Sequence, residues 1–237
     1  MPPIGHTLDE RQSLACALRI LAPSWQENLS GHITFACDDG TLLANPWGKW
    51  WAEVQASDIV CVDPEGGVID GRWDVTPAVF LHTELHRARP DATVIVHNHP
   101  RHATFLACLG VEPVIAHQNS AIFAGELAWV DEYDGTIESV AAGAALAARV
   151  GNASGIVLAN HGAIVTGATF GEACYKAVTF ERMCRFTADA LRAGRELRPL
   201  PGAPYTALKA ELIRNTPDAY WNGAVRQLVT TQPDVLE

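Results

Sequence analysis

The sequence lacks an apolar run long enough to cross a membrane, because none approaches the roughly 18 residues that a transmembrane helix needs. Its start, residues 1–9, also lacks the basic stretch and following apolar stretch of a secretory signal. No two of the six cysteines are spaced as CxxC, the arrangement typical of zinc and redox sites. We therefore expect a cytoplasmic protein with reduced thiols and no membrane partner.

The chain is also short of positive charge, with 17 Lys and Arg against 27 Asp and Glu and a net charge of -10. An acidic surface repels phosphate backbones, so we expect no nucleic-acid partner. Hydrophobic residues make up 48% of the 237 residues, which is an ordinary globular composition and enough for a large core. A site for a small anion stays possible, because a metal ion or an arginine can reverse the local field.

Hydrophobic periodicity predicts helices and strands in alternation. The helices are expected at residues 7–21, 77–87, 102–109, 138–150, 170–193, 205–215 and 218–229. The strands are expected at residues 32–37, 41–44, 58–62, 68–70, 93–96, 115–117, 127–130, 155–159 and 163–166. Thr7 and Glu10 have the spacing of a capping box for the first helix, and Pro23 is expected to end it.

No internal repeat and no long linker divide the chain. We therefore predict one α/β domain over residues 1–237. Residues 199–237 are expected to form a C-terminal helical extension that can cover an active site.

Two histidines stand at the end of the expected strand 93–96, in the segment Val96-His97-Asn98-His99-Pro100. Side chains alternate across a strand, so His97 and His99 point the same way and can share one metal ion. On its own, the pair is also compatible with two polar loop histidines.

A third histidine occurs in a similar setting, in Leu158-Ala159-Asn160-His161-Gly162 at the end of another apolar strand. Three imidazoles leave coordination positions open for water or substrate, which is typical of a catalytic rather than a structural site. The residues suit zinc, manganese, iron, cobalt or nickel, and the sequence does not choose among them.

Together, the VHNHP and ANHG segments resemble the class II aldolase/adducin family. Further segments match the family's motifs in order, at residues 28–32, 45–48, 57–60, 89–91 and 132–136, and the resemblance covers roughly residues 14–191. It implies a single three-layer αβα domain with a central, largely antiparallel sheet. It also implies a homotetramer with sites at subunit interfaces, and one divalent metal ion per subunit (Zn, Mn, Fe or Co) held by His97, His99 and His161.

The chain departs from the sugar-phosphate members of this family at their acidic residue. Counting back without gaps from residues 89–91, the glutamate of their P-S-S-E stretch falls on Ala78, and a methyl group cannot transfer a proton. The glycine expected before Asn28 is Glu27, whose charge is wrong for a phosphate, and the following T-P-x-G loop holds Trp47. We therefore expect that the substrate is not a sugar phosphate.

These departures resemble the family's decarboxylases of hydroxylated aromatic or heteroaromatic acids, such as dihydroxyphthalate or hydroxypyridine dicarboxylate. Decarboxylation beside a phenol leaves an electron pair that a Lewis-acidic metal stabilises, so it needs a proton donor rather than a strong base. The candidate proton donors are His32, His117 and Tyr220. The candidate residues for binding a small carboxylic acid substrate are Asn28, Trp47, Lys49 and Arg226.

Other interpretations remain open at this point. His117 could instead be a histidine of the core, and Arg226 a solvated surface charge. Trp47 could instead pack in a core or in a subunit interface. An aldolase or epimerase would need another acid, such as Glu84 or Glu53. A non-catalytic adducin-like binding module predicts loss of the metal ligands, and an iron oxygenase is a lesser alternative.

Overall fold

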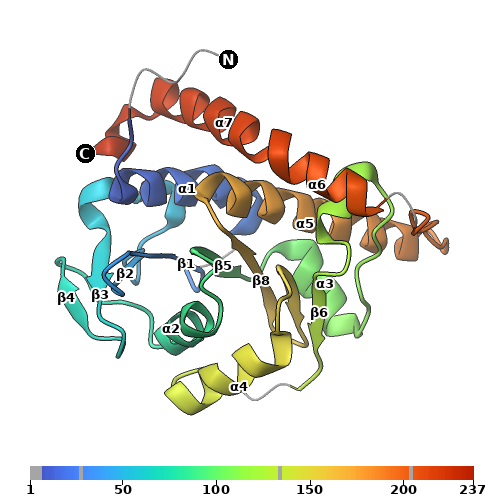
Figure 1. Cartoon of the computed structure of the whole chain (residues 1–237), viewed down its shortest axis with the longest axis horizontal. Coiled ribbons are helices and arrows are strands. Elements are labelled where there is room, and N and C mark those ends of the chain that lie inside the picture. The colour runs from blue at the N-terminus through green and yellow to red at the C-terminus, as the bar shows by residue number, and fades with distance from the viewer. Residues whose placement is uncertain (1–6, 27–28, 133–134, 203–204) are drawn as a thin grey trace.

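One central sheet organises the chain in a computed structural model that describes residues 7–26, 29–132, 135–202 and 205–237. Its eight strands run in the order β4-β3-β2-β1-β5-β8-β7-β6 (Figure 1). The strands are β1 (His32–Ala36), β2 (Leu42–Ala44), β3 (Val60–Val62), β4 (Val68–Asp70), β5 (Val94–Asn98), β6 (Leu127–Val130), β7 (Gly155–Leu158) and β8 (Gly162–Gly167). Only β6 and β7 pair in parallel, which confirms the expected largely antiparallel sheet.

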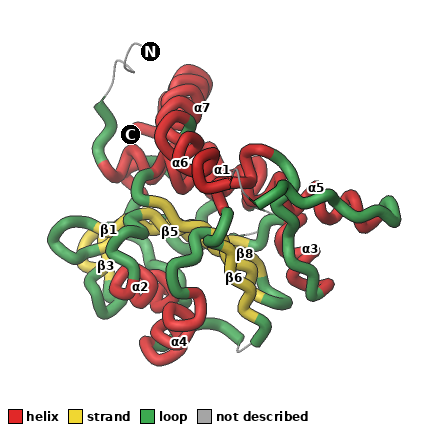
Figure 2. The backbone as a smooth tube through the Cα atoms, turned by 45° about the vertical axis from the view of Figure 1, so that its right-hand side comes forward, coloured by secondary structure: helices red, strands yellow, loops and turns green. Residues whose placement is uncertain are grey.

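Helices cover both faces of this sheet (Figure 1), and the same layering is visible in the rotated view of Figure 2. One face carries α1 (Glu10–Trp25), α3 (Arg101–Leu109), α5 (Phe170–Arg192), α6 (Tyr205–Asn215) and α7 (Pro217–Thr231). The other carries α2 (Val79–Ala88) and α4 (Val140–Val150). The three-layer αβα arrangement is therefore confirmed.

Alternation along β5 divides its side chains between the two helical layers. Val94 and Val96 belong to the large core under α1 and α5, whereas Ile95 belongs to the smaller core under α2 and α4. His97 has the same parity as Ile95, so it faces the α2 side. His32 pairs with His97 in register and faces that side as well.

The first helix differs from its prediction at both ends. Asp9, not Thr7, caps its start, because the Asp9 carboxylate accepts from the Gln12 amide and the Gln12 side chain accepts from the Asp9 amide. Pro23 does not end the helix, which continues to Trp25. Trp25 is fully buried and donates from Nε1 to the Ala177 carbonyl at 2.8 Å, so tertiary packing holds the last turn despite the missing Pro23 N–H.

One other segment was predicted wrongly as strand, and the strand predicted at residues 58–62 begins later, at Val60. Residues 115–117 lie outside the sheet, because their backbone bonds elsewhere: the Leu200 amide donates to the Ile115 carbonyl. Asp58 ends a short 3-10 turn, Ala56–Asp58, where its carboxylate accepts from the Gln55 amide. The remaining predicted elements are present, with ends shifted by at most a few residues.

The C-terminal extension packs on α1 and α5. The helix α7 lies along α1 (Figure 1), and its Val225 and Leu228 are buried in the large core with α1 and α5. Within one chain, α6 and α7 therefore lie across the sheet from α2 and α4. No helix in the described part of the chain is both long and apolar enough to span a membrane.

Candidate metal centre

The antiparallel pairing of β5 and β8 brings three histidines together. Asn98 near the end of β5 pairs with Ala163 near the start of β8, so the chain after β5 lies beside the turn that precedes β8. His97 is in β5, His99 follows it, and His161 is in the turn between β7 and β8. Asn160 in that turn has φ 55°, a left-handed conformation that asparagine tolerates better than most residues.

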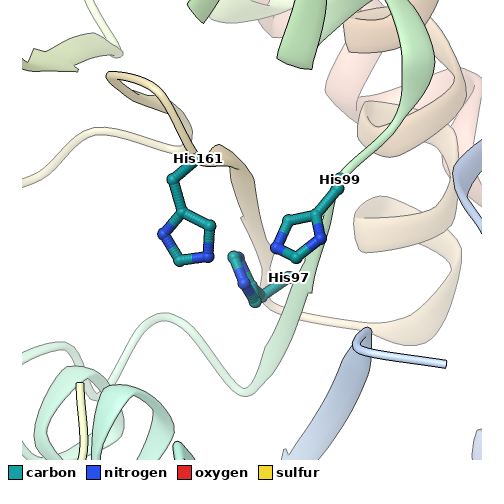
Figure 3. A group of neighbouring side chains, drawn as sticks. All are labelled: His97, His99 and His161. Carbon is teal, nitrogen blue, oxygen red and sulfur yellow. The ribbon is translucent and has the colours of Figure 1, made fainter. Parts of the chain in front are cut away.

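The three imidazoles converge on one point, as Figure 3 shows. One ring nitrogen from each of His97, His99 and His161 lies within 4.8 Å of the other two. The ring centroids are 4.9 to 5.4 Å apart. Three ring nitrogens this close together could bind a single metal ion.

Hydrogen bonding and burial both fit these residues to a metal ion. His97 Nδ1 lies 3.0 Å from the Ala163 carbonyl, which can only accept, so Nδ1 carries the hydrogen and Nε2 keeps its lone pair. His99 Nε2 is buried and has no hydrogen-bond partner among the described residues. Burial lowers the pKa of His97 well below its usual value, and burial together with His99 lowers the pKa of His161 to about 4. Neutral imidazoles are the form that binds metal.

A cavity of about 290 Å³ opens beside the three histidines. Its walls come from β1, from the loops that precede α2 and α4, and from the loop that holds Trp47. The lining residues are Ser30, His32, Trp47, Thr76, Pro77, Ala78, Leu81, His97, His99, Thr136, Ile137, Glu138 and His161. The structure thus brings His32 and Trp47 to the metal centre, and it places Ala78 in the cavity wall.

Glu138 is the one carboxylate among the described lining residues, and sequence analysis did not identify it. It was assigned to the start of a helix, but α4 begins at Val140 with Ser139 as its cap. Its only sequence signal was its position just after the matched segment 132–136. Its proximity to the histidines depends on how α4 packs against α2, which a local pattern does not show.

Lys49 does not line the cavity. Its Nζ lies 2.6 Å from Oδ2 of the buried Asp58, whose other oxygen accepts from Arg72 at 2.8 Å and from Trp73 Nε1 at 3.0 Å. Burial alone would raise the pKa of Asp58, but the hydrogen bonds from Lys49 and Arg72 outweigh it and hold the pKa below its usual value. Within one chain, Lys49 therefore has a structural partner rather than a substrate.

Replacing Asp58 with alanine is expected to lower the free energy of unfolding by about 3 kcal/mol, because several charge-assisted hydrogen bonds are lost at once. Urea denaturation measures this. Glu112→Ala, at an exposed site, is the control and should change stability by less than about 0.5 kcal/mol. Equal effects of the two substitutions would show that the Asp58 cluster does not stabilise the fold.

Three other predicted site residues lie on the opposite side of the sheet. His117 packs against Phe186 of α5, with ring centroids 5.2 Å apart. Tyr220 of α7 packs against Tyr175 of α5 at 5.9 Å, and burial raises its pKa to about 12. Arg226 is exposed on α7. Within one chain, none of these three side chains lines the metal cavity.

The remaining predictions fall outside the cavity or outside the described residues. Asn28 lies outside the described part of the chain. Glu84 is buried on α2 and pairs with Arg87, and Glu53 accepts a hydrogen bond from the Trp50 amide. Neither glutamate lines the metal cavity, so neither replaces the acid that is missing at Ala78.

Comparison with known proteins agrees with this geometry. The model of the protein family "Class II Aldolase and Adducin N-terminal domain" matches residues 11–188. A Caulobacter vibrioides protein assigned to aldolase class 2 is 32% identical over 194 residues, which cover 78% of this chain and 74% of that protein. A 3,4-dihydroxyphthalate decarboxylase of a Terrabacter species is 30% identical over 220 residues, which cover 86% of this chain and 90% of that protein.

A solved structure supports the fold in the same way. L-fuculose 1-phosphate aldolase from Glaciozyma antarctica superposes with a TM-score of 0.83 at 24% identity, covering 100% of this chain and 97% of that one. The three-histidine centre, the sheet topology and the match to residues 11–188 lead to one conclusion: the chain belongs to the class II aldolase and adducin family.

Proposed function

We propose that this chain is a metal-dependent decarboxylase of a hydroxylated aromatic or heteroaromatic carboxylic acid, such as a dihydroxyphthalate or hydroxypyridine dicarboxylate. One observation carries the proposal: the three histidines face a cavity whose wall contains Ala78. By the family resemblance, the sugar-phosphate aldolases have a glutamate at this position. The 30% identity to a 3,4-dihydroxyphthalate decarboxylase over most of the chain supports it.

The cavity suits this chemistry. When bound, a divalent metal ion would act as a Lewis acid on neighbouring hydroxyl and carboxylate oxygens. His32 lines the cavity and is the described imidazole outside the triad that can exchange a proton with a substrate there. Trp47, which is 42% exposed, offers a flat apolar surface to an aromatic ring.

Lys49, His117, Tyr220 and Arg226 do not line the cavity of their own chain, so a contact with its substrate would have to come from a second copy. We propose a homotetramer with sites at subunit interfaces, as the family resemblance implies. The side chains of Trp47 and Trp50 are 42% and 46% exposed, and a subunit contact would cover this apolar area.

Release of CO2 is the measurement that tests the proposed function. The purified protein, with its metal determined by elemental analysis, is offered a panel of ortho-hydroxy aromatic carboxylates that includes dihydroxyphthalates. We expect metal-dependent CO2 release from at least one acid, and none from metal-stripped protein. A metal-loaded protein that releases no CO2 from any member of the panel would contradict the proposal.

Glu138 favours an aldolase or epimerase as the second candidate, because it supplies a carboxylate within the cavity. The same protein offered small hydroxy-carbonyl substrates would then form aldol cleavage products or epimers. An adducin-like binding module explains the site less well, since all three histidines are present and converge.

A further inference from the structure

A chain of hydrogen-bonded side chains runs from the metal cavity into the layer of α2. His32 Nδ1 lies 2.7 Å from His82 Nε2, and His82 Nδ1 lies 2.6 Å from Thr34 Oγ1. Thr34 Oγ1 also lies 2.8 Å from His86 Nε2, and His86 Nδ1 lies 2.8 Å from the carbonyl oxygen of Ala92. Since His32 lines the cavity, this series of hydrogen bonds connects the cavity to the backbone that precedes β5.

The Ala92 carbonyl fixes the direction of each hydrogen bond. A carbonyl only accepts, so His86 Nδ1 carries a hydrogen, and Nε2 of the neutral ring must accept. The Thr34 hydroxyl gives its single hydrogen to His86 and therefore accepts from His82 Nδ1. His82 Nε2 then accepts from His32 Nδ1, because a neutral imidazole has only one N–H.

The surroundings keep the His82 and His86 rings neutral. Burial lowers the pKa of His82 well below the usual value, and neighbouring histidines lower it further. Burial also lowers the pKa of His86, to about 4. Each of these two rings therefore carries one hydrogen at neutral pH, on Nδ1, and the His82 Nε2 lone pair faces His32 Nδ1.

We infer that Thr34, His82 and His86 hold His32 in the tautomer that has its hydrogen on Nδ1 and a lone pair on Nε2. His82 on α2 occupies Nδ1, so Nε2 is the nitrogen that His32 offers to the cavity. His32 consequently meets a substrate as a proton acceptor, whereas the sequence suggested only a donor. Thr34, His82 and His86 are positioning residues, since they act through His32.

This assignment deepens the proposed decarboxylation, and its catalytic part rests on that function. His32 Nε2 accepts the proton of the ring hydroxyl and then donates it to the ring carbon that bears the carboxylate. The bond between this carbon and the carboxylate breaks, its electron pair stays in the ring, and CO2 leaves. The product oxygen regains a proton from solvent, so one proton is consumed for each CO2 released.

The first test reads the tautomer directly. Metal-free protein labelled with nitrogen-15 in histidine is studied by NMR, in which a ring nitrogen that carries hydrogen differs from one with a lone pair. We expect the hydrogen on Nδ1 in His32, His82 and His86. A hydrogen on Nε2 of His32 would overturn the inference, whatever the protein's activity.

Substitutions at Thr34 test whether the series of hydrogen bonds determines the tautomer of His32. Thr34→Val removes the hydroxyl and keeps the shape, whereas Thr34→Ser keeps the hydroxyl. Thr83→Val is the matched control, because Thr83 Oγ1 is buried on α2 without a hydrogen-bond partner among the described residues. We expect mixed tautomers at His32 and His82 in Thr34→Val only. Wild-type tautomers in Thr34→Val would refute the positioning role.

Turnover separates this inference from the proposed function. On an accepted acid, Thr34→Val should lower kcat by about 10- to 100-fold with little change in KM, while Thr34→Ser and Thr83→Val stay near wild type. Mixed tautomers with an unchanged kcat would overturn the catalytic role of His32. The expected tautomers in a wild-type protein that decarboxylates nothing would contradict the proposed function but uphold the tautomer assignment.

Discussion

His97→Ala is expected to abolish metal-dependent turnover. His97 is 2% exposed and supplies one of three converging nitrogens, so alanine leaves only His99 and His161 to hold the ion. Loss of an outer hydrogen-bonding partner costs about 10- to 100-fold in metal affinity or activity, and loss of a ligand should cost more. Metal titration of the purified variant, together with elemental analysis, measures the effect.

A matched histidine elsewhere provides the control for this experiment. His102 Nδ1 lies 2.6 Å from Oε1 of Glu181, and neither residue lines the cavity. His102→Asn keeps an N–H donor near the same place, so its metal content should equal that of wild type. If His97→Ala also retained a full equivalent of tightly bound metal, the three-histidine centre would be wrong.

Gly162→Ala is expected to damage both the fold and the metal centre, although Gly162 is not a ligand. A Cβ at this position would lie 2.6 Å from the Asn98 carbonyl oxygen and 2.7 Å from His99 Cδ2. The paired ends of β5 and β8 would have to separate, and overpacking of this kind costs about 1–3 kcal/mol. His99 would move with them, so metal affinity should also fall.

Urea denaturation of the metal-free protein and metal titration measure these two effects separately. Gly202→Ala is the control, because no atom lies within 4 Å of a Cβ built there and the residue is exposed. Wild-type stability and metal affinity in Gly162→Ala would mean that the strand ends yield at no cost. In that case the close approach at Gly162 would not be a requirement of the site.

The three histidines of the candidate metal centre could be predicted from sequence because each belongs to a local pattern. His97 and His99 stand at the end of a β-branched strand, and His161 lies in the tight turn after a second apolar strand. The antiparallel register that joins the two strand ends was not visible in either pattern. The family resemblance supplied that long-range information, and it also identified the position of Ala78, which the structure places in the cavity wall.

The roles that local patterns do not show are those that depend on tertiary contacts. His82 and His86 are one helical turn apart, a spacing that equally suits packing, and only the approach of β1 to α2 joins them to Thr34 and His32. Lys49 is another case, because its charge suggested substrate binding until the fold placed Asp58 beside it. His117 and Tyr220 likewise pack against α5, which no motif near them indicated.

The candidate metal centre and the cavity walls come from different kinds of structure. His97 and His161 are anchored by the β5 and β8 pairing at the centre of the sheet, where a change of register would disturb both cores. The walls come instead from three loop segments that contain Trp47, residues 76–78 and residues 136–138. Mutations in these loops can therefore change the shape of the cavity while the paired strands keep the three histidines in place.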